Sequence, residues 1–147
     1  MTKAIYFDMD GTIADLYGCD GWLDDLCAGY TRPYREARPL VDMRKLGRTL
    51  NKLQSQGWQI GIVSWLAKSG SDEYGDRVAA TKRKWLEKHL SSVKFDEVVI
   101  AKYGMPKQHI VKHPFGILFD DEQRNRDNWT GTAYDVHNIL AVLAALD

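Results

Sequence analysis

Short apolar segments alternate with helix-type segments along most of the chain, and this alternation restricts the fold more than any other feature. The apolar segments, rich in β-branched residues, lie at residues 3–10, 59–65, 97–101, 116–120 and 133–136. The segments with helical character lie at residues 41–56, 76–90, 122–129 and 138–146. Strands without a polar face are typical of a parallel sheet that is covered on both sides. The sequence therefore predicts an α/β fold with a doubly wound, Rossmann-like parallel sheet of about five strands.

The length of 147 residues suits a single domain with one core, which we expect to span residues 1–147. A polar stretch at residues 14–39 follows the first strand and is expected to form a small cap or flap insertion. Its aromatic residues and arginines are Tyr17, Trp22, Tyr30, Tyr34, Arg32, Arg35 and Arg38. They fit either a lid that stacks on a substrate and pairs with its phosphate, or a flap that packs its aromatic side chains on the body.

The charges of the chain balance, since Lys plus Arg and Asp plus Glu each number 20. No global field then draws the protein to nucleic acid or to a membrane, so an anionic ligand must be held by local groups. The two cysteines lack a CxxC spacing and predict neither a zinc site nor a disulfide framework. The sequence has no signal-peptide pattern and no apolar run of membrane-spanning length. We therefore expect a cytoplasmic protein without a membrane partner, either a monomer or a homodimer.

Two aspartates, Asp8 and Asp10, stand at the end of the first strand. Because side chains alternate along a strand, both are expected on one side, at the carboxyl edge where α/β sheets bind ligands. Such carboxylates repel each other and any phosphate unless a cation compensates them, and oxygen ligands with open water positions suit Mg²⁺. The simpler alternative is a capped turn with two solvated aspartates.

Residues 8–15 (DMDGTIAD) resemble the first signature of the haloacid dehalogenase superfamily. The resemblance implies that Asp8 attacks phosphorus and becomes an aspartyl-phosphate, and that Asp10 acts as acid and then as base. It also implies that Gly11 and Thr12 contact the phosphate. A carboxylate nucleophile that divides one displacement into two steps, with a neighbouring acid, agrees with this chemistry.

The second signature of the superfamily is a serine or threonine at the end of the second strand, where this chain has Ser64. The resemblance implies that its hydroxyl, together with the adjoining Trp65, contacts the phosphoryl group. A serine at a strand end, taken alone, is more often a helix N-cap.

The third signature is a lysine of variable position, and five lysines qualify by their order along the chain. They are Lys68, Lys82, Lys102, Lys107 and Lys112. We assign Lys107, because its context PKQHIV resembles that of the lysine in deoxyribonucleotidase-like members. Its ammonium would neutralise the nucleophile and the phosphate together. Lys102 is the second choice, and a solvated surface lysine is the simplest alternative.

The fourth signature is an acidic pair after the fourth strand, and Asp120 and Asp121 occupy this place. One of them is expected to bind Mg²⁺ together with Asp8 and Asp10. The other would orient waters or the lysine, and the sequence does not distinguish the two roles. Asp121 also fits the N-cap of the following helix.

The four signatures in family order imply a Mg²⁺-dependent phosphomonoesterase. Residues 8–15 and 118–125 resemble nucleotidase-like members, and residues 80–90 resemble a helix of deoxyribonucleotidases and of the phosphatase domain of phage polynucleotide kinase. The implied partner is a small phosphorylated substrate, such as a nucleotide or a nucleic-acid end. Deoxyribonucleotidases, however, carry a larger helical cap than residues 14–39 provide. The alternatives are a phospho-receiver signalling domain, a catalytically silent binding module, and within the family a phosphomutase or a phosphatase of another small metabolite.

Overall fold

The computed structural model describes residues 2–147, in which strands and helices alternate as the sequence predicts. The strands are β1 (Ala4–Phe7), β2 (Ala14–Asp15), β3 (Arg38–Pro39), β4 (Gln59–Trp65), β5 (Glu97–Ala101), β6 (Ile117–Phe119) and β7 (Thr132–Tyr134). The helices are α1 (Trp22–Cys27), α2 (Arg32–Glu36), α3 (Met43–Ser55), α4 (Asp72–His89), α5 (Gln123–Asn128) and α6 (Ile139–Leu146). Two 3₁₀ turns, η1 (Lys107–His109) and η2 (Val136–Asn138), complete the order. Across residues 2–147 no helix has both the length and the apolar character that a bilayer-spanning helix needs.

Within the described residues, five strands form one parallel sheet in the order β5-β4-β1-β6-β7. This arrangement confirms the predicted α/β fold with a Rossmann-like sheet. From the central β1 the chain passes to β4 and β5 on one side, and then crosses to β6 and β7 on the other. The strand order therefore reverses at β1, and ligands of such sheets bind beyond the carboxyl ends of the strands at this reversal.

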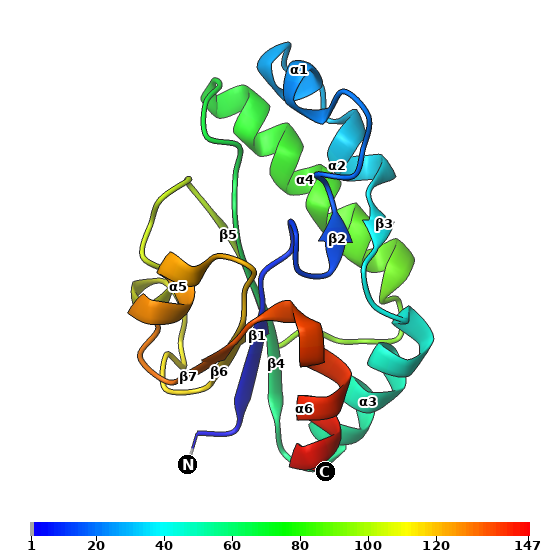
Figure 1. Ribbon diagram of the computed structural model, residues 1–147, viewed down its shortest axis with the longest axis vertical. Coiled ribbons are helices and arrows are strands. Elements are labelled where there is room, and N and C mark those ends of the chain that lie inside the picture. The colour runs from blue at the N-terminus through cyan, green and yellow to red at the C-terminus, as the bar shows by residue number, and fades with distance from the viewer. Residues whose placement is uncertain (1) are drawn as a thin grey trace.

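Helices cover one face of the sheet, and a thinner layer covers the other (Figure 1). On the first face α3 presents Leu46, Leu50 and Leu53 at helical spacing to a core that it shares with α4 and α6. On the second face Tyr6 packs against Trp129, which follows α5, with 5.7 Å between the ring centroids. Together these two layers bury both faces of the sheet.

Helix α4 begins at Asp72, so the predicted start at residue 76 was wrong. The Ser71 side chain accepts a hydrogen bond of 3.1 Å from the Tyr74 backbone N–H and caps the first turn. Gly75 lies inside the helix, where a Cβ would come within 3.1 Å of Leu66 Cδ1. The glycine there reflects close packing rather than a turn.

Residues 14–39, which we call the flap, place α1 and α2 at the end of the molecule opposite to α6 (Figure 1). The antiparallel pair β2–β3 closes the flap at its base, and α1 and α2 lie between these strands. Leu16 and Tyr34 of the flap pack on Tyr74 and Val78 of α4. The flap is therefore anchored to the body by Leu16 and Tyr34 while it extends above the ends of the strands.

Candidate active site

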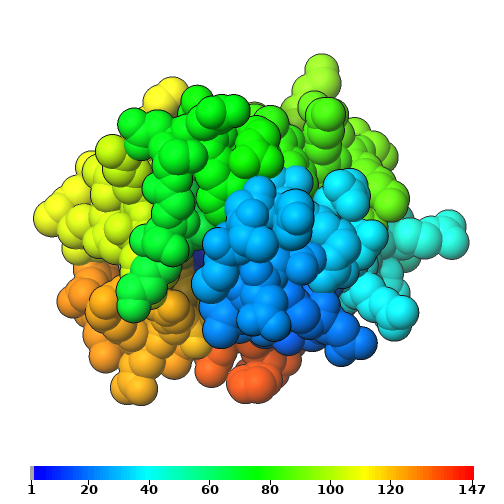
Figure 2. All heavy atoms as spheres, turned by 90° about the horizontal axis from the view of Figure 1, so that it is seen from above, coloured from blue at the N-terminus to red at the C-terminus, as the bar shows by residue number. Residues whose placement is uncertain are grey.

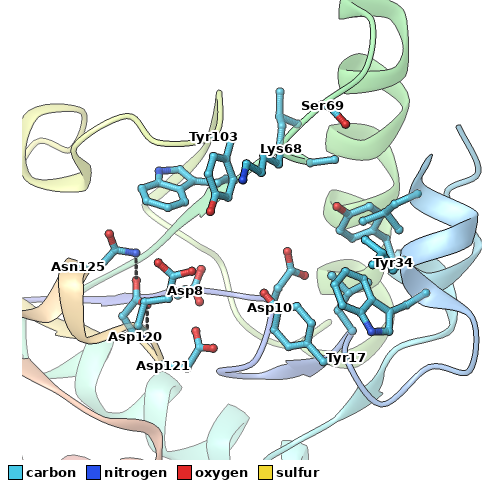
Figure 3. Close-up of a pocket in the computed structure, with 18 of the residues that line it drawn as sticks. Asp8, Asp10, Tyr17, Tyr34, Lys68, Ser69, Tyr103, Asp120, Asp121 and Asn125 are labelled. Atoms are coloured by element: carbon cyan, nitrogen blue, oxygen red, sulfur yellow. Dashed lines mark hydrogen bonds between the residues drawn. The ribbon is translucent and has the colours of Figure 1, made fainter.

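Three carboxylates meet at the carboxyl ends of β1 and β6. Phe7 lies level with Phe119 in these adjacent strands, so Asp8 and Asp120 leave the sheet side by side. Oxygen atoms of Asp8, Asp120 and Asp121 all lie within 4.8 Å of one another. These three residues form the acidic cluster, whereas Asp10 stands apart from them, toward Tyr17 (Figure 3).

The turn after β1 fits closely around the acidic cluster. Gly11 has a φ of +80°, and a Cβ at this position would come within 2.3 Å of Asp121 Oδ2. The buried Thr12 hydroxyl donates to Asp8 Oδ2 at 3.0 Å and accepts from the Asp121 N–H at 3.2 Å. Both residues lie behind the carboxylates rather than among the residues that line the cavity described below. Their contacts hold Asp8 and Asp121 in place.

Lys107 lies between two members of the acidic cluster. Its side chain is only 2% exposed, and Nζ donates to Asp8 Oδ1 at 2.9 Å and to Asp120 Oδ2 at 2.6 Å. Asp120 also accepts from the Asn125 amide at 3.2 Å and from the Glu122 N–H at 2.9 Å. Lys102, the second choice from the sequence, is exposed and lies outside the cavity lining. Glu122, rather than Asp121, occupies the N-cap position of α5.

A second buried lysine, Lys82 of α4, lies beside the site. Its Nζ donates to Asp10 Oδ2 and to Ser64 Oγ, both at 2.8 Å, and to the Trp65 carbonyl at 2.7 Å. Ser64 is fully buried beneath this lysine and does not line the cavity. Of the four candidate metal-binding carboxylates, three therefore form the acidic cluster, and the carboxylate of Asp10 pairs with Lys82 instead.

The sequence reasoning placed Lys82 among five candidates without giving it a role, and it missed Asn125. A signal for Lys82 was present, because it lies at helical spacing on the same face of α4 as the buried Val78, Trp85 and Leu86. A lysine on a buried face requires a nearby acceptor or acid. Asn125 sits in a short polar helix and gives no comparable signal.

A cavity of about 240 Å³ opens above the carboxylates. Its floor includes Asp8, Asp10, Lys107 and the acidic pair after β6, and its two walls are largely aromatic and apolar. The wall from the flap includes Tyr17, Trp22, Leu23 and Leu26, and the opposite wall includes Trp65, Leu66, Lys68 and Tyr103. Seen from above, the opening lies between the blue flap, the green segment after β4 and the orange α5 region, with dark blue atoms of the early chain at its base (Figure 2).

The arginines of the flap do not line this cavity. Arg32 forms ion pairs with Asp25 and Glu36 inside the flap, and Arg35 lies beside Glu36. The predicted pairing of these arginines with a phosphate is therefore not seen, whereas Tyr17 and Trp22 do face the cavity. The flap combines the two interpretations, since Tyr34 packs on the body and other aromatic residues line the opening.

Burial and mutual repulsion raise the pKa values of the acidic groups. Burial, and then the nearby Asp8 carboxylate, raise the pKa of Asp121 to about 8 and that of Asp120 to about 6, although Lys107 opposes the rise at Asp120. Burial also raises the pKa of Asp10, and Lys82 opposes this shift. Burial alone would lower the pKa of Lys107, but Asp8 and Asp120 outweigh it and raise that pKa. The site holds more negative charge than its lysines compensate.

The acidic cluster fits a hard divalent cation. It offers only carboxylate oxygens, with the ammonium of Lys107 as the one cation bonded to them in residues 2–147. Three ionised carboxylates and one ammonium leave two negative charges, which Mg²⁺ would balance. Oxygen donors with room for water on the cavity side are the environment that Mg²⁺ prefers.

No model of a known protein family matches this sequence, and no curated protein matches it. Among solved structures, the chain is similar to the crystal structure of D,D-heptose 1,7-bisphosphate phosphatase from Burkholderia thailandensis. The TM-score is 0.57 and the sequence identity 10%, and the match covers 99% of this chain and 98% of that chain. At this identity, the likeness concerns the fold.

Proposed function

We propose that this chain is a Mg²⁺-dependent phosphomonoesterase of the haloacid dehalogenase type, with Asp8 as the residue that receives the phosphoryl group. One observation carries the proposal. Asp8 lies at the floor of an open cavity and is bonded to the buried Lys107, with Asp120 and Asp121 beside it. The likeness of the fold to a phosphatase and the sequence signatures support the same activity.

Asp8 and Asp121 are the carboxylates that would hold Mg²⁺. Asp120 is engaged on both oxygens, by Lys107 and Asn125 on Oδ2 and by the Glu122 N–H on Oδ1, so its role is to orient Lys107. When bound, the cation neutralises charge on the nucleophile and on the phosphoryl oxygens. The two residues of the acidic pair thus take different roles.

The chain's own groups supply the other parts of the reaction. A carboxylate oxygen of Asp8 attacks phosphorus, and the bond from phosphorus to the leaving oxygen breaks as Asp10 gives that oxygen a proton. Asp10 then takes a proton from the water that hydrolyses the aspartyl-phosphate. The Lys107 ammonium uses two of its three protons on carboxylates and has one left for a phosphoryl oxygen. Positioned charges of this kind lower the barrier to phosphoryl transfer.

The substrate class that we propose is a nucleotide or the phosphate end of a polynucleotide. Tyr17 and Trp22 on one wall, with Trp65 and Tyr103 on the other, offer aromatic surfaces on which a planar base can stack. The printed name of the structural neighbour specifies a heptose bisphosphate for that protein, so sugar phosphates belong in any test.

The strand order argues against a phospho-receiver domain. Receivers follow the flavodoxin-like order 2-1-3-4-5, in which the second strand lies at the edge of the sheet. In this sheet the corresponding strand, β4, lies inside, next to the central β1. A silent binding module is the remaining alternative, and it predicts ligand binding without turnover.

Phosphate release from a panel of esters tests the proposal. The panel contains 4-nitrophenyl phosphate, 5′- and 3′-nucleotides, a 3′-phosphorylated oligonucleotide and a hexose phosphate, each with Mg²⁺ and with EDTA. We expect Mg²⁺-dependent release that Asp8→Asn abolishes, because the amide keeps the shape of the side chain but is not a nucleophile. Turnover that persists in folded Asp8→Asn excludes the covalent mechanism. No release by a folded protein that binds Mg²⁺ favours the binding module.

A further inference from the structure

The ammonium of Lys82 is saturated by three acceptors. It donates to Asp10 Oδ2, to Ser64 Oγ and to the Trp65 carbonyl, all between 2.7 and 2.8 Å. A lysine ammonium has three protons, so no donor remains for another group. Only 1% of the side chain is exposed, and Lys82 is absent from the cavity lining in the described chain. It therefore has no means of contacting a substrate.

Lys107 differs from Lys82 in each of these respects. It lines the cavity, and its bonds to Asp8 and Asp120 leave one proton unused. The two buried lysines thus have separate tasks, one facing the phosphoryl group and the other facing the protein. The contacts of Lys82 identify the group that it holds in place.

One of the three acceptors of Lys82 is Asp10, the proposed acid and base. The hydrogen bonds found in residues 2–147 engage only Oδ2 of this carboxylate, and Asp10 lines the cavity, so Oδ1 is the oxygen available there. Lys82 itself is fixed between Ser64, the Trp65 carbonyl and the Tyr34 ring, whose centroid lies 5.1 Å from Nζ. Three elements, β4, α4 and α2, therefore determine where Oδ2 is held, and with it the direction of Oδ1.

We propose that Lys82 is a positioning residue that orients Asp10 for proton transfer, an inference that rests on the phosphomonoesterase function proposed above. In the first step Asp10 Oδ1 gives its proton to the leaving oxygen as the bond from that oxygen to phosphorus breaks. In the second step the same oxygen accepts a proton from the attacking water. Lys82 keeps its own protons in both steps. Its contribution is geometric, because proton transfer requires Oδ1 within hydrogen-bond reach of the reacting oxygen.

Two aryl phosphates with different leaving groups test this role. 2,4-Dinitrophenyl phosphate releases a weakly basic phenolate that hardly needs an acid, whereas phenyl phosphate releases a basic one that does. We expect Lys82→Met to lower kcat/KM for phenyl phosphate at least about tenfold more than for the dinitrophenyl ester, since a general acid contributes about 10²- to 10⁴-fold. The ratio of the two values is independent of the active enzyme concentration, so a partly unfolded variant still gives a valid result. Lys82→Gln, which keeps an amide donor, should show a smaller change in this ratio.

Asp10→Asn and the double variant identify the group through which Lys82 acts. Asp10→Asn should discriminate between the two esters in the same direction, and adding Lys82→Met should change the ratio by less than about twofold, because the two residues act as one unit. Lys84→Met, at an exposed position of the same helix, is the matched control and should leave both rates unchanged. Equal losses on both esters, or discrimination that multiplies in the double variant, would overturn the proposal. A wild-type protein that hydrolyses neither ester with Mg²⁺ contradicts the proposed function itself, which is a distinct outcome.

Discussion

Replacing Gly11 by alanine should disturb the metal site far more than it disturbs the fold. The backbone at Gly11 has a φ of +80°, a conformation that costs an L-residue about 1–2 kcal/mol. The new Cβ would come within 2.3 Å of Asp121 Oδ2 and 2.8 Å of Asp121 Cγ. The carboxylate must therefore retreat by about 1 Å to reach an ordinary contact distance. Asp121 is a proposed Mg²⁺ ligand, so the displacement acts directly on the site.

Gly57 provides a matched control for the backbone strain. Its φ is +94°, and a Cβ there would meet no atom within 4 Å. Gly57→Ala and Gly11→Ala should each lower the free energy of unfolding by about 1–2 kcal/mol. Only Gly11→Ala should also lose activity, by about 100-fold, because a displacement of about 1 Å in a catalytic group can cost that much.

The assay combines thermal unfolding of both variants with phosphate release at a series of Mg²⁺ concentrations. Gly11→Ala should need a higher Mg²⁺ concentration for half-maximal rate, while Gly57→Ala should follow the wild type. If Gly11→Ala kept the Mg²⁺ dependence and the rate of the wild type, then the contact between the turn and Asp121 would have no part in the metal site. Equal losses of activity in the two variants would assign the effect to backbone strain alone.

Three further outcomes follow from the geometry. Lys107→Met should abolish turnover and destabilise the fold by about 3–5 kcal/mol, because it leaves buried acids without their cation. Lys102→Met should change neither the rate nor the melting temperature. The reverse result would reassign the catalytic lysine. Burial, and then the nearby Asp8 carboxylate, raise the pKa of Asp120 to about 6 and that of Asp121 to about 8, so without metal the folded state retains protons that the unfolded chain has lost. The free energy of unfolding in EDTA should therefore fall as the pH rises from about 4 to about 8. Mg²⁺ should raise the melting temperature more at pH 8 than at pH 6. If the free energy of unfolding in EDTA rose over this pH range, the result would contradict the crowding of the carboxylates. Trp22→Ala should raise KM for nucleotides more than for 4-nitrophenyl phosphate, and equal changes in KM would remove the stacking role of that wall.

Local sequence signals were sufficient for most of the sheet. Residues 59–65 and 97–101 were predicted as strands and are β4 and β5 with the same bounds, because continuous apolar runs have few other uses in an α/β chain. Helix α4 was predicted to start four residues too late, since a glycine such as Gly75 signals a loop unless its packing against Leu66 is known. The error arises from a contact between two segments of the chain, and the periodicity of a sequence carries no information about such contacts.

The candidate site likewise has one part that the sequence predicted and another that it did not. The sequence placed Asp8, Asp120 and Lys107 at the ends of strands or close to them, and the parallel register brings these residues together. The hydrogen bond between Lys82 and Asp10 was not predicted, because these residues are 72 positions apart and meet only through the packing of α4 on the sheet. The same packing covers Ser64, which the family resemblance placed against the phosphoryl group.

The two lysines together divide the carboxylates of the site into groups with different net charge. Lys82 pairs with Asp10 one to one, so this pair is neutral when Asp10 is ionised and then needs no further cation. Lys107 faces three carboxylates, which leave two negative charges on the acidic cluster when all three are ionised. These charges favour a divalent cation at the acidic cluster rather than at Asp10, whose carboxylate is already engaged on one oxygen. Burying two lysines is costly without such partners, so the arrangement supports the proposed metal site at the acidic cluster and the proposed role of Asp10 in proton transfer.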